Sequence, residues 1–572
     1  MTQIIDVRPT SAPPVLTEGA RGLVRWVCTS NPFYAISALM VIMGLWISFG
    51  AQIRAEQTWA LMFGLAGYTL LLAVTACLLV RFGGVWDDVR TVLLLVVLMF
   101  LATSVTFDEA LARSPVHGAS CYLVGWLFAT TVSEGMLRGM RLGLPPWFRG
   151  PYYLILSLFF LYPLGFIPLL DLPRSEALEW LLFGFSTVAG LVFLTLLPAI
   201  RRGPDYVRDN GSPWRWPLYP WALFVFLGFG VAARAFLLCW SMQHIERTEP
   251  ERYIFGPYFL VPFGLAIAVL LLEIGLVRRS RRVLWIALTL PMALVVLSMV
   301  GHRPDPLYQG FLDLFRARLG GTPLFLTVLA MVFFSIYASI RRVPRATEVL
   351  TAALAMLSVI GPGSLDLNGL VSPRTWPLLA IAVLQTGLGL RRHDAWRCLV
   401  GASGLVLAAS ISLGNLEGAP ARTPIAFHLI LLAVLTIGAV FNDRFGRSLR
   451  TPGALLVFLA CLASASGRFE RPDALPEWVM DIYPFFMAAL LAGYGAWLRH
   501  RPSMVVAPLI VLGGLGAAGW RGYCVLRQVV LGLDQIALGL ASFGLAALIS
   551  LAKSGALTRW WARKRKVPDP MI

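Results

Sequence analysis

Ionisable side chains inside apolar segments are the first residues to consider, because a charge within a membrane-length run is costly and usually has a role in binding, transport or structure. Arg234 is the clearest case, since it lies about one and a half turns inside one end of an apolar run at 218–240. A guanidinium at this depth needs a carboxylate or carbonyl partner. Asp108, Glu109 and Asp171 are expected at the same depth. These four residues are the candidate substrate- or ion-binding residues, and a purely structural ion pair is the alternative.

The adjacent acids Asp108 and Glu109 suggest a second chemistry, in which one of them acts as a general base on a lipid-linked substrate. They are expected just outside the third apolar helix. In this they are similar to the acidic outer-loop residues of membrane glycosyltransferases that use lipid-linked sugars. Those families carry the acids in the first outer loop, whereas the corresponding loop here, 51–57, has only Arg54 and Glu56 as charged residues. No family is therefore assigned.

Metal, nucleotide and cofactor sites are not indicated by the sequence. The six histidines fall in different connections without ligand spacing, and the seven cysteines include no Cys-x-x-Cys pair. There is no Walker A loop, Gly-rich dinucleotide loop, His-Glu-x-x-His or Gly-x-Ser-x-Gly motif. We therefore expect no metal and no cofactor, and the sequence does not decide whether the protein is an enzyme.

The elements that must position these residues are apolar helices. Of the 572 residues, 58% are hydrophobic and 14% are charged, whereas water-soluble domains have about a quarter charged residues. A helix needs about 20 apolar residues to cross the hydrocarbon core, and the apolar runs predict an all-α, polytopic transmembrane helix bundle of about 18 spans. The expected spans are 33–51, 58–80, 89–107, 119–137, 151–171, 178–200, 218–240, 256–277, 283–301, 322–340, 346–362, 374–390, 395–414, 424–441, 452–467, 480–498, 502–520 and 532–552.

Arginines mark the connections at one end of these helices. The clearest connection runs from Arg278 to Arg282, separates two membrane-length apolar runs and predicts a tight helical hairpin. Similar basic turns follow every second expected helix, and the positive-inside rule assigns that face to the cytoplasm. An even number of spans places both the N- and the C-terminus there. The net charge of +18 is thus interpreted as membrane topology, and no nucleic-acid partner is expected.

The chain is divided into four parts on these grounds. Residues 1–31 form a cytoplasmic N-terminal segment, which is not expected to be a cleaved signal peptide because the first apolar run begins too far along the chain. Residues 32–255 form an N-terminal transmembrane bundle, and residues 256–553 form a C-terminal transmembrane hairpin array. Residues 554–572 form a basic cytoplasmic tail.

Glycines near the ends of successive return helices in the second half recur at intervals of roughly 50 to 60 residues, which predicts tandem helical-hairpin repeats. Many similar helices joined by short loops would also look periodic, so the sequence leaves both interpretations open.

The lipid bilayer is the expected partner, with anionic lipids at the cytoplasmic face, and no protein partner is indicated. Aromatic and basic side chains of the tail suit the headgroup layer. The residues assigned to headgroup contact are Trp560, Trp561, Arg563, Lys564, Arg565 and Lys566. Two outer segments, Pro306 to Leu319 and Arg521 to Leu531, are expected to form short helices in the membrane interface.

Three functions are compatible with these features. A carrier or flippase-like transporter is favoured because the chain has many helices and short loops, and it predicts a polar central cavity that holds Arg234. An outer-face membrane enzyme predicts a groove open to lipid beside Asp108 and Glu109. A structural or accessory subunit of a membrane complex predicts a filled interior and a stable partner. In each case the expected location is the cell (inner/plasma) membrane, as a multi-pass protein.

Overall fold

The computed structural model of the chain describes residues 33–49, 55–170, 176–244, 253–414, 422–465, 477–530 and 532–553. Within these ranges the chain is helical and contains no β-strand, so the all-α fold class is confirmed for them. Asp171, residues 1–31 and the tail at 554–572, with its six expected headgroup residues, lie outside the described residues.

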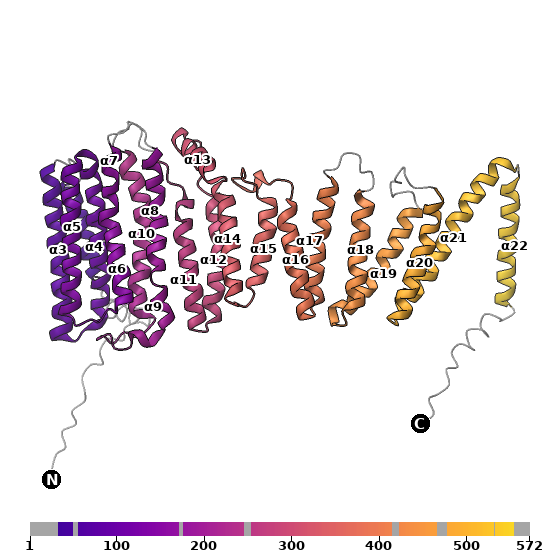
Figure 1. Ribbon diagram of the computed structural model, residues 1–572, viewed down its shortest axis with the longest axis horizontal. Helices are drawn as coiled ribbons and strands as arrows, with labels where there is room; N and C mark the ends of the chain where they lie inside the picture. Colours follow the sequence, from indigo (N-terminus) through magenta and orange to yellow (C-terminus); the bar gives the residue numbers. More distant parts are fainter. Residues whose placement is uncertain are drawn as a thin grey trace, which may run out of the picture. The chain divides into compact units, whose positions relative to one another are not determined.

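The chain forms two compact units, Met1–Ser372 and Pro373–Ile572. The division between these two units falls at 372/373, and the helices just after residue 256 pack on those before it. The expected division into parts at 255/256 stays a prediction. The α-helices of the first unit are α2 (Phe33–Phe49), α3 (Ala55–Leu78), α4 (Trp86–Arg113), α5 (Pro115–Gly139), α6 (Pro146–Leu161), α7 (Ile167–Leu170), α8 (Glu176–Leu194), α9 (Leu197–Arg202), α10 (Leu218–His244), α11 (Val261–Val277), α12 (Arg281–Met299), α13 (Pro306–Leu319), α14 (Pro323–Ile340) and α15 (Ala346–Val359) (Figure 1).

Short 3-10 and π segments join several of these helices. They are η1 (Leu79–Gly83), η2 (Tyr162–Phe166), η3 (Pro204–Val207), η4 (Pro257–Leu260) and η5 (Leu367–Gly369).

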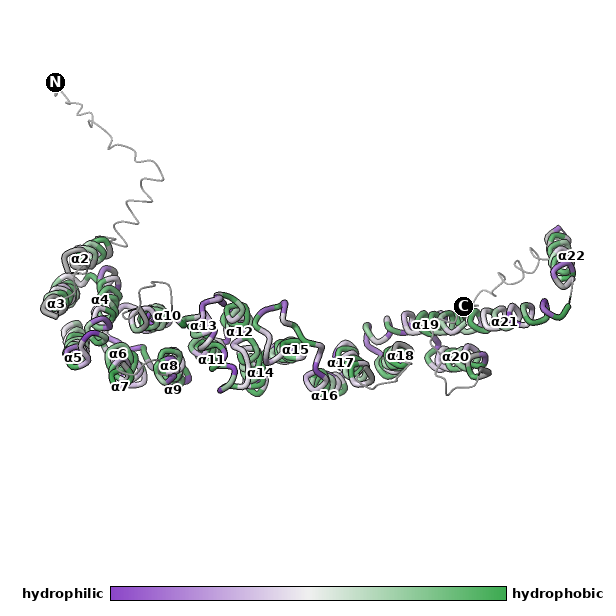
Figure 2. Tube along the Cα trace, turned by 90° about the horizontal axis from the view of Figure 1, so that it is seen from above, coloured by the Kyte–Doolittle hydropathy of each residue, from purple (hydrophilic) through white to green (hydrophobic). Residues whose placement is uncertain are grey.

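The second unit is built from helices alone within the described ranges. Its helices are α16 (Thr375–Arg392), α17 (Ala395–Gly414), α18 (Arg422–Val440), α19 (Arg444–Ala465), α20 (Glu477–Trp497), α21 (Arg501–Val529) and α22 (Leu533–Lys553). In each unit the hydrophilic residues lie mainly in the connections and at helix ends, while the helices are predominantly apolar (Figure 2).

Eleven helices in the described part are long and apolar enough to cross a membrane, as expected of a membrane-embedded, multi-pass protein. Three further apolar helices, at Ala346–Val359, Ile425–Val440 and Asp534–Ala547, are shorter. Each of the eighteen expected segments lies on a helix of the structure. A crossing by all eighteen stays a prediction, because within the described residues the length and hydropathy of a span are shown for these eleven helices.

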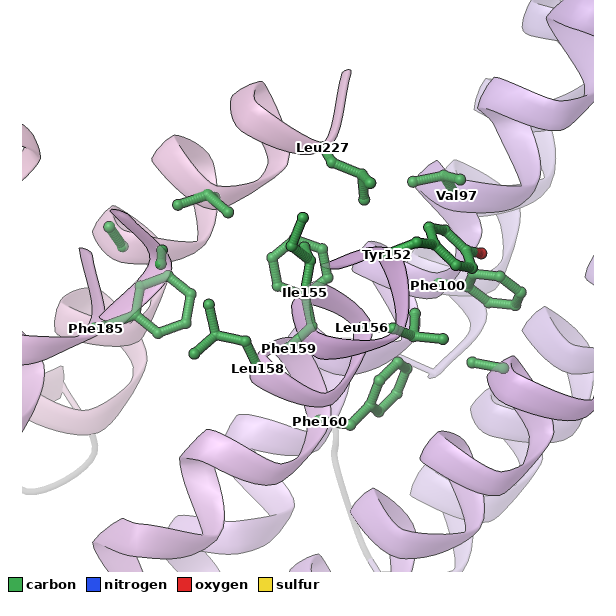
Figure 3. Close-up of a cluster of buried hydrophobic side chains, with 14 of the residues drawn as sticks. Val97, Phe100, Tyr152, Ile155, Leu156, Leu158, Phe159, Phe160, Phe185 and Leu227 are labelled. Carbon is green, nitrogen blue, oxygen red and sulfur yellow. The ribbon is translucent and has the colours of Figure 1, made fainter. Parts of the chain in front are cut away.

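The core of the first unit is centred on α6, which packs against α4, α5, α8 and α10. Ile155, Phe159 and Phe160 are buried on its different faces (Figure 3). Many large apolar side chains on the outside of the unit are exposed, such as Phe63 and Phe229. Within lipid this exposure is not penalised, so association of the helices depends on close packing and on polar contacts between them.

From α11 onward, packing within each unit is mainly between neighbouring helices. In the first unit α11, α12, α14 and α15 follow one another in this way, and in the second unit the same holds from α16 to α21. Leu431, Val457, Leu491 and Ile510 belong to one hydrophobic core of the second unit. No described side chain of α22 is buried, and this helix has few contacts with α21.

Five helix connections share one turn geometry. The residue with a positive φ is Arg141, Arg279, Arg342, His393 or Arg499. In every case the next backbone N–H donates to the carbonyl five residues earlier, as in Ser280 to Gly275. This is the Schellman closure of a helix C-terminus, and a basic side chain there also interacts favourably with the helix dipole. The shared turn is consistent with hairpin repeats, whose origin by duplication stays a prediction.

The two segments expected to be interfacial helices have different outcomes. Pro306–Leu319 is a separate helix, α13, as expected. It buries Tyr308, Phe311 and Phe315 against α8 and η4, so its apolar face packs on protein. The second expectation is wrong, because the chain from Arg521 onward continues α21 without a break to Val529.

Candidate functional site

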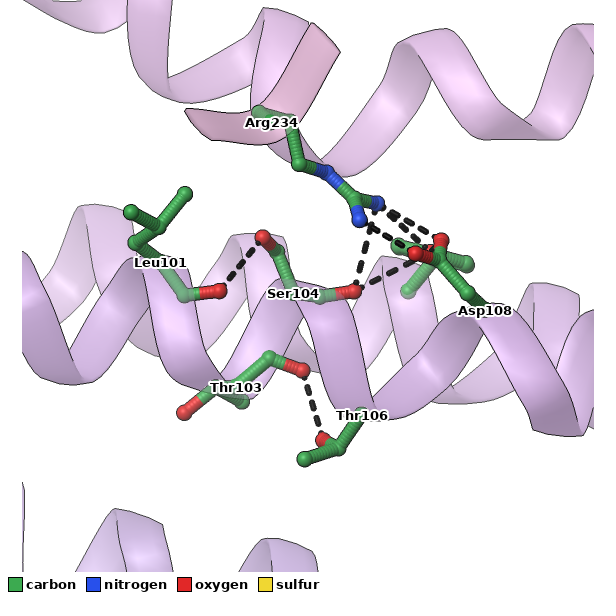
Figure 4. A network of polar contacts seen from close by, with 7 residues as sticks. Leu101, Thr103, Ser104, Thr106, Asp108 and Arg234 are labelled. Carbon is green, nitrogen blue, oxygen red and sulfur yellow. Dashed lines mark hydrogen bonds and ion pairs between the residues drawn. The ribbon is translucent and has the colours of Figure 1, made fainter. Parts of the chain in front are cut away.

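Arg234 is the most deeply buried charge on α10, and its side chain has no exposed surface. Val231 and Leu238 lie one helical turn away on either side and are buried. This face of α10 therefore packs against the rest of the unit. The guanidinium therefore points from α10 toward α4 (Figure 4). A charge in this position requires a partner on the facing helix.

That partner is Asp108, which is 1% exposed. The Arg234 Nη2 atom donates to Asp108 Oδ1 at 2.7 Å, and Nη1 donates to Oδ2, so the pair is bidentate. Of the three carboxylates expected to serve as its partner, the structure selects this one. α4 continues to Arg113, beyond the expected end at 107, and so Asp108 lies on a helix face and not in a loop.

Tyr122 of α5 completes the network. Its hydroxyl donates to Asp108 Oδ1, and it accepts a hydrogen bond from Arg234 Nη2 at 3.0 Å. The backbone carbonyl of Ser104 is a further acceptor for Nη2, at 3.3 Å. Three helices, α4, α5 and α10, are thus joined through one buried ion pair. Tyr122 could not be identified from the sequence, because it lies on another helix and its separation from Asp108 along the chain has no local helical spacing.

Few reactions are open to this network, because its side chains are bonded to one another. Asp108 accepts hydrogen bonds from a guanidinium and a phenol, which stabilise its ionised form and occupy both oxygens. Neither Arg234 nor Asp108 lines any of the three pockets described below. The Arg234 Nε–H is buried and has no hydrogen-bond partner among the described residues. The arrangement is suited to joining helices, and it does not present a base to a substrate.

Glu109 does not share this environment. It follows Asp108 on α4, but successive residues of a helix point about 100° apart, and Glu109 pairs with Arg113 on the same helix. Both of these side chains are partly exposed. The acidic dipeptide therefore does not form a pair of carboxylates that act together. Asp171, the last of the candidate residues, lies outside the described residues.

A second buried carboxylate, Glu273 of α11, was not assigned to a site from the sequence. Its side chain is 0% exposed. Arg341, which directly follows α14, has its Nη2 atom 2.9 Å from Glu273 Oε2, and Arg201 Nε of α9 lies 3.4 Å from the same atom. Tyr337 donates its hydroxyl to Oε1. This acid joins α9, α11 and α14 at the arginine-rich end of the unit.

A cavity of about 90 Å³ lies at the other end of the same α4–α10 contact. Arg90 of α4 and Leu218 of α10 are exposed lining residues, and Val97 and Tyr152 lie deeper. At about 1.5 Å per residue, Arg90 is about 27 Å from Asp108 along α4, which is close to the thickness of the hydrocarbon core. α4 and α10 are therefore fastened at one end and enclose a cavity at the other.

Two wider grooves are apolar and open to the outside of their units. One, of about 310 Å³, lies between α8, α10 and α11 and includes Phe193, Phe229 and Ile267. The other, of about 350 Å³, lies in the second unit between α16, α17 and α18 and includes Leu405 and Leu432. Neither groove has a charged lining residue.

Metal-ligating side chains are not gathered in the described ranges, where no group of three or more His, Cys, Asp or Glu residues could hold a metal ion. The histidines that can be followed contact neutral side chains instead, as in His302 with Tyr308 and His428 with Tyr483.

No protein-family model matches this chain, and neither the curated proteins nor the solved structures include one with significant similarity to it. Functional inference therefore rests on the geometry of the chain itself.

Proposed function

We propose that the protein is a structural or accessory subunit of a membrane complex. Each of the three hypotheses made a different prediction for the interior. A carrier requires a polar cavity at Arg234, whereas this residue is fully buried and bound to Asp108. An enzyme with Asp108 as the base requires access to that carboxylate, whereas it is 1% exposed. A structural subunit requires no accessible polar site at these residues, and the burial of the paired Arg234 and Asp108 is the observation that carries the proposal.

The exposed last helix of the described part supports a role in assembly. A helix within a membrane is stabilised in its position by packing against other helices, yet none of the described side chains of α22 is buried. A Cβ atom added at Gly539 or Gly544 of this helix would meet no atom within 4 Å. α22 is thus proposed as the surface that packs against a helix of a partner subunit.

The experiment compares a substitution on α22 with a matched one elsewhere. Gly539→Leu is expected to leave the melting temperature unchanged, because its new side chain meets nothing in the chain itself, and to reduce a stoichiometric co-purifying subunit by about tenfold. Gly67→Leu is the control, since Gly67 on α3 also has open space around it. Native mass spectrometry after release from lipid nanodiscs measures the amount of co-purifying subunit in both variants. A single chain of wild-type protein, with no subunit in fixed ratio, would overturn the proposal.

The orientation proposed with this function follows from the arginine-rich turns. All eighteen helices would cross the cell membrane, with both termini and those turns in the cytoplasm, and the tail from Trp560 to Lys566 at the headgroups. Single cysteines placed at Ser280 and Asp305 should react with an impermeant thiol reagent from opposite sides. Labelling of both from one side would contradict this orientation.

A further inference from the structure

The cavity between α4 and α10 has features that define its ligand. We infer that it binds the end of one acyl chain of an anionic phospholipid, which enters from the leaflet at the arginine-rich end of the first unit. This inference concerns a binding site and does not depend on the proposed role in assembly.

The floor of the cavity offers no hydrogen-bond donor to a polar ligand. Ser133 donates its hydroxyl proton to the carbonyl of Ala129 at 2.7 Å. Its oxygen lies 2.7 Å from the hydroxyl of Tyr152, and since the serine proton is already used, Tyr152 must be the donor in this contact. Both protons are therefore committed within the protein. Tyr219, which is also buried in the lining, donates its hydroxyl proton to the carbonyl of Gly143 at 3.1 Å. Other deep lining residues, such as Val97 and Met136, are apolar.

An apolar ligand suits this lining, and the volume limits its size. An empty apolar cavity of about 150 Å³ takes up a molecule as large as benzene, while water does not enter it. The present cavity, about 90 Å³, accommodates a short length of hydrocarbon. The rest of a longer chain would lie in lipid along the exposed lining residues, such as Leu218.

The entrance favours an anionic headgroup over a neutral one. Arg90 lines the cavity and is exposed in the first turns of α4. Arg141 and Arg215 are exposed and directly follow the lining residues Met140 and Trp214. Basic residues at this depth attract anionic lipid, each by an amount that corresponds to about fivefold in affinity.

Carboxylates also occur near this entrance, and they determine which arginine is the best probe. Asp88 is on the same helix as Arg90, and Asp209 is in the connection before α10. Arg90 lines the cavity directly, so its replacement tests headgroup binding most specifically.

The first test blocks the cavity. Ala222 of α10 is a partly exposed lining residue, and Ala222→Phe should occupy the space of the chain end. Native mass spectrometry after release from nanodiscs of mixed phosphatidylglycerol and phosphatidylcholine should show one retained phosphatidylglycerol on the wild type. Its retention should fall about tenfold in the variant, as expected for losing the burial of two methylene groups. Ala60→Phe, on the exposed side of α3, is the control and should retain the lipid.

The second test separates the headgroup from the chain. Arg90→Gln should reduce the preference for phosphatidylglycerol over phosphatidylcholine about fivefold, while Arg81→Gln, in η1 at the same end of the helices, should not. Equal retention in Ala222→Phe and Ala60→Phe would overturn the site, and an unchanged preference in Arg90→Gln would overturn the anionic specificity.

A third measurement does not depend on a variant that folds. Phosphatidylglycerol with a photoreactive diazirine near the end of its chain should label the wild-type peptide that contains Met136 and Met140, both of which line the cavity. Labelling confined to exposed surfaces such as Phe63 would contradict the inference.

Discussion

Asp108 and Glu273 are both fully buried carboxylates of the first unit, but their partners differ in access to water. Asp108 pairs with Arg234, whose side chain is 0% exposed, whereas the partners of Glu273, Arg201 and Arg341, are 55% and 40% exposed. When the partner carboxylate is removed, an exposed arginine can turn to water or to lipid headgroups. Arg234 has no such alternative, and the two sites should therefore respond differently to the same substitution.

Asp108→Asn should have the largest effect of the substitutions considered. It leaves the Arg234 guanidinium buried without a counter-ion, and an arginine does not lose its proton within a protein. Breaking a buried pair in this way costs about 3–5 kcal/mol. Denaturant unfolding in mixed micelles measures the change in the free energy of unfolding.

The matched control replaces both charges with apolar groups. The double variant Asp108→Leu, Arg234→Met should be within about 1 kcal/mol of the wild type, since a buried ion pair gains little over apolar packing. If the double variant is as unstable as Asp108→Asn, the loss does not arise from an unpaired charge, and the comparison fails.

Arg234→Met alone should be less harmful than Asp108→Asn, at about 2–3 kcal/mol. The remaining carboxylate can be neutralised by taking up a proton, which the remaining arginine cannot do by losing one. The loss in this variant should therefore be smaller at low pH than at high pH. Unfolding measured across a pH series tests this, and the same loss at every pH would contradict it.

Glu273→Gln should cost about 1–2 kcal/mol, because its arginines reach water and Tyr337 keeps a partner in the amide. Glu109→Gln on the surface of α4 is the control, and it should change stability by less than about 0.5 kcal/mol, as exposed pairs do. A loss for Glu273→Gln as large as that for Asp108→Asn would show that the exposure of the partner does not matter.

His302 provides the smallest expected effect and a site with neutral partners for comparison. Its Nε2–H donates to the carbonyl of Ser298 at 3.1 Å, and Nδ1 accepts from the Tyr308 hydroxyl at 2.9 Å. Burial lowers the pKa of His302 below its ordinary value of 6.5, so the unfolded chain binds this proton first. Stability should therefore fall as the pH decreases below 6.5.

The His302→Gln variant separates this histidine from other titrating groups. It keeps a side chain that forms hydrogen bonds and removes the titration, so the slope of melting temperature against pH below 6.5 should be smaller than in the wild type. An identical slope would assign the pH dependence to other residues.

Much of the fold could be predicted from the sequence, and the misassigned residues show where this reasoning stops. The length of each apolar run correctly predicted a helical segment. Asp108 was placed outside the third helix, because a charge was interpreted as the end of an apolar run. α4 continues through Asp108 to Arg113, since the aspartate is neutralised by a residue 126 positions away. Glu273 was not recognised as a buried acid from the sequence, because its partners Arg201 and Arg341 are far from it along the chain.

The sequence by itself determined that the chain is a set of apolar helices with basic connections, because a lipid environment requires such lengths and such ends. It also identified Arg234 as a residue that needs a carboxylate. Only the tertiary structure decided that this carboxylate is Asp108 and that the interior beside it is filled. The physical reason is that partner choice depends on how each helix is rotated about its axis, and this is set by the packing of many side chains together.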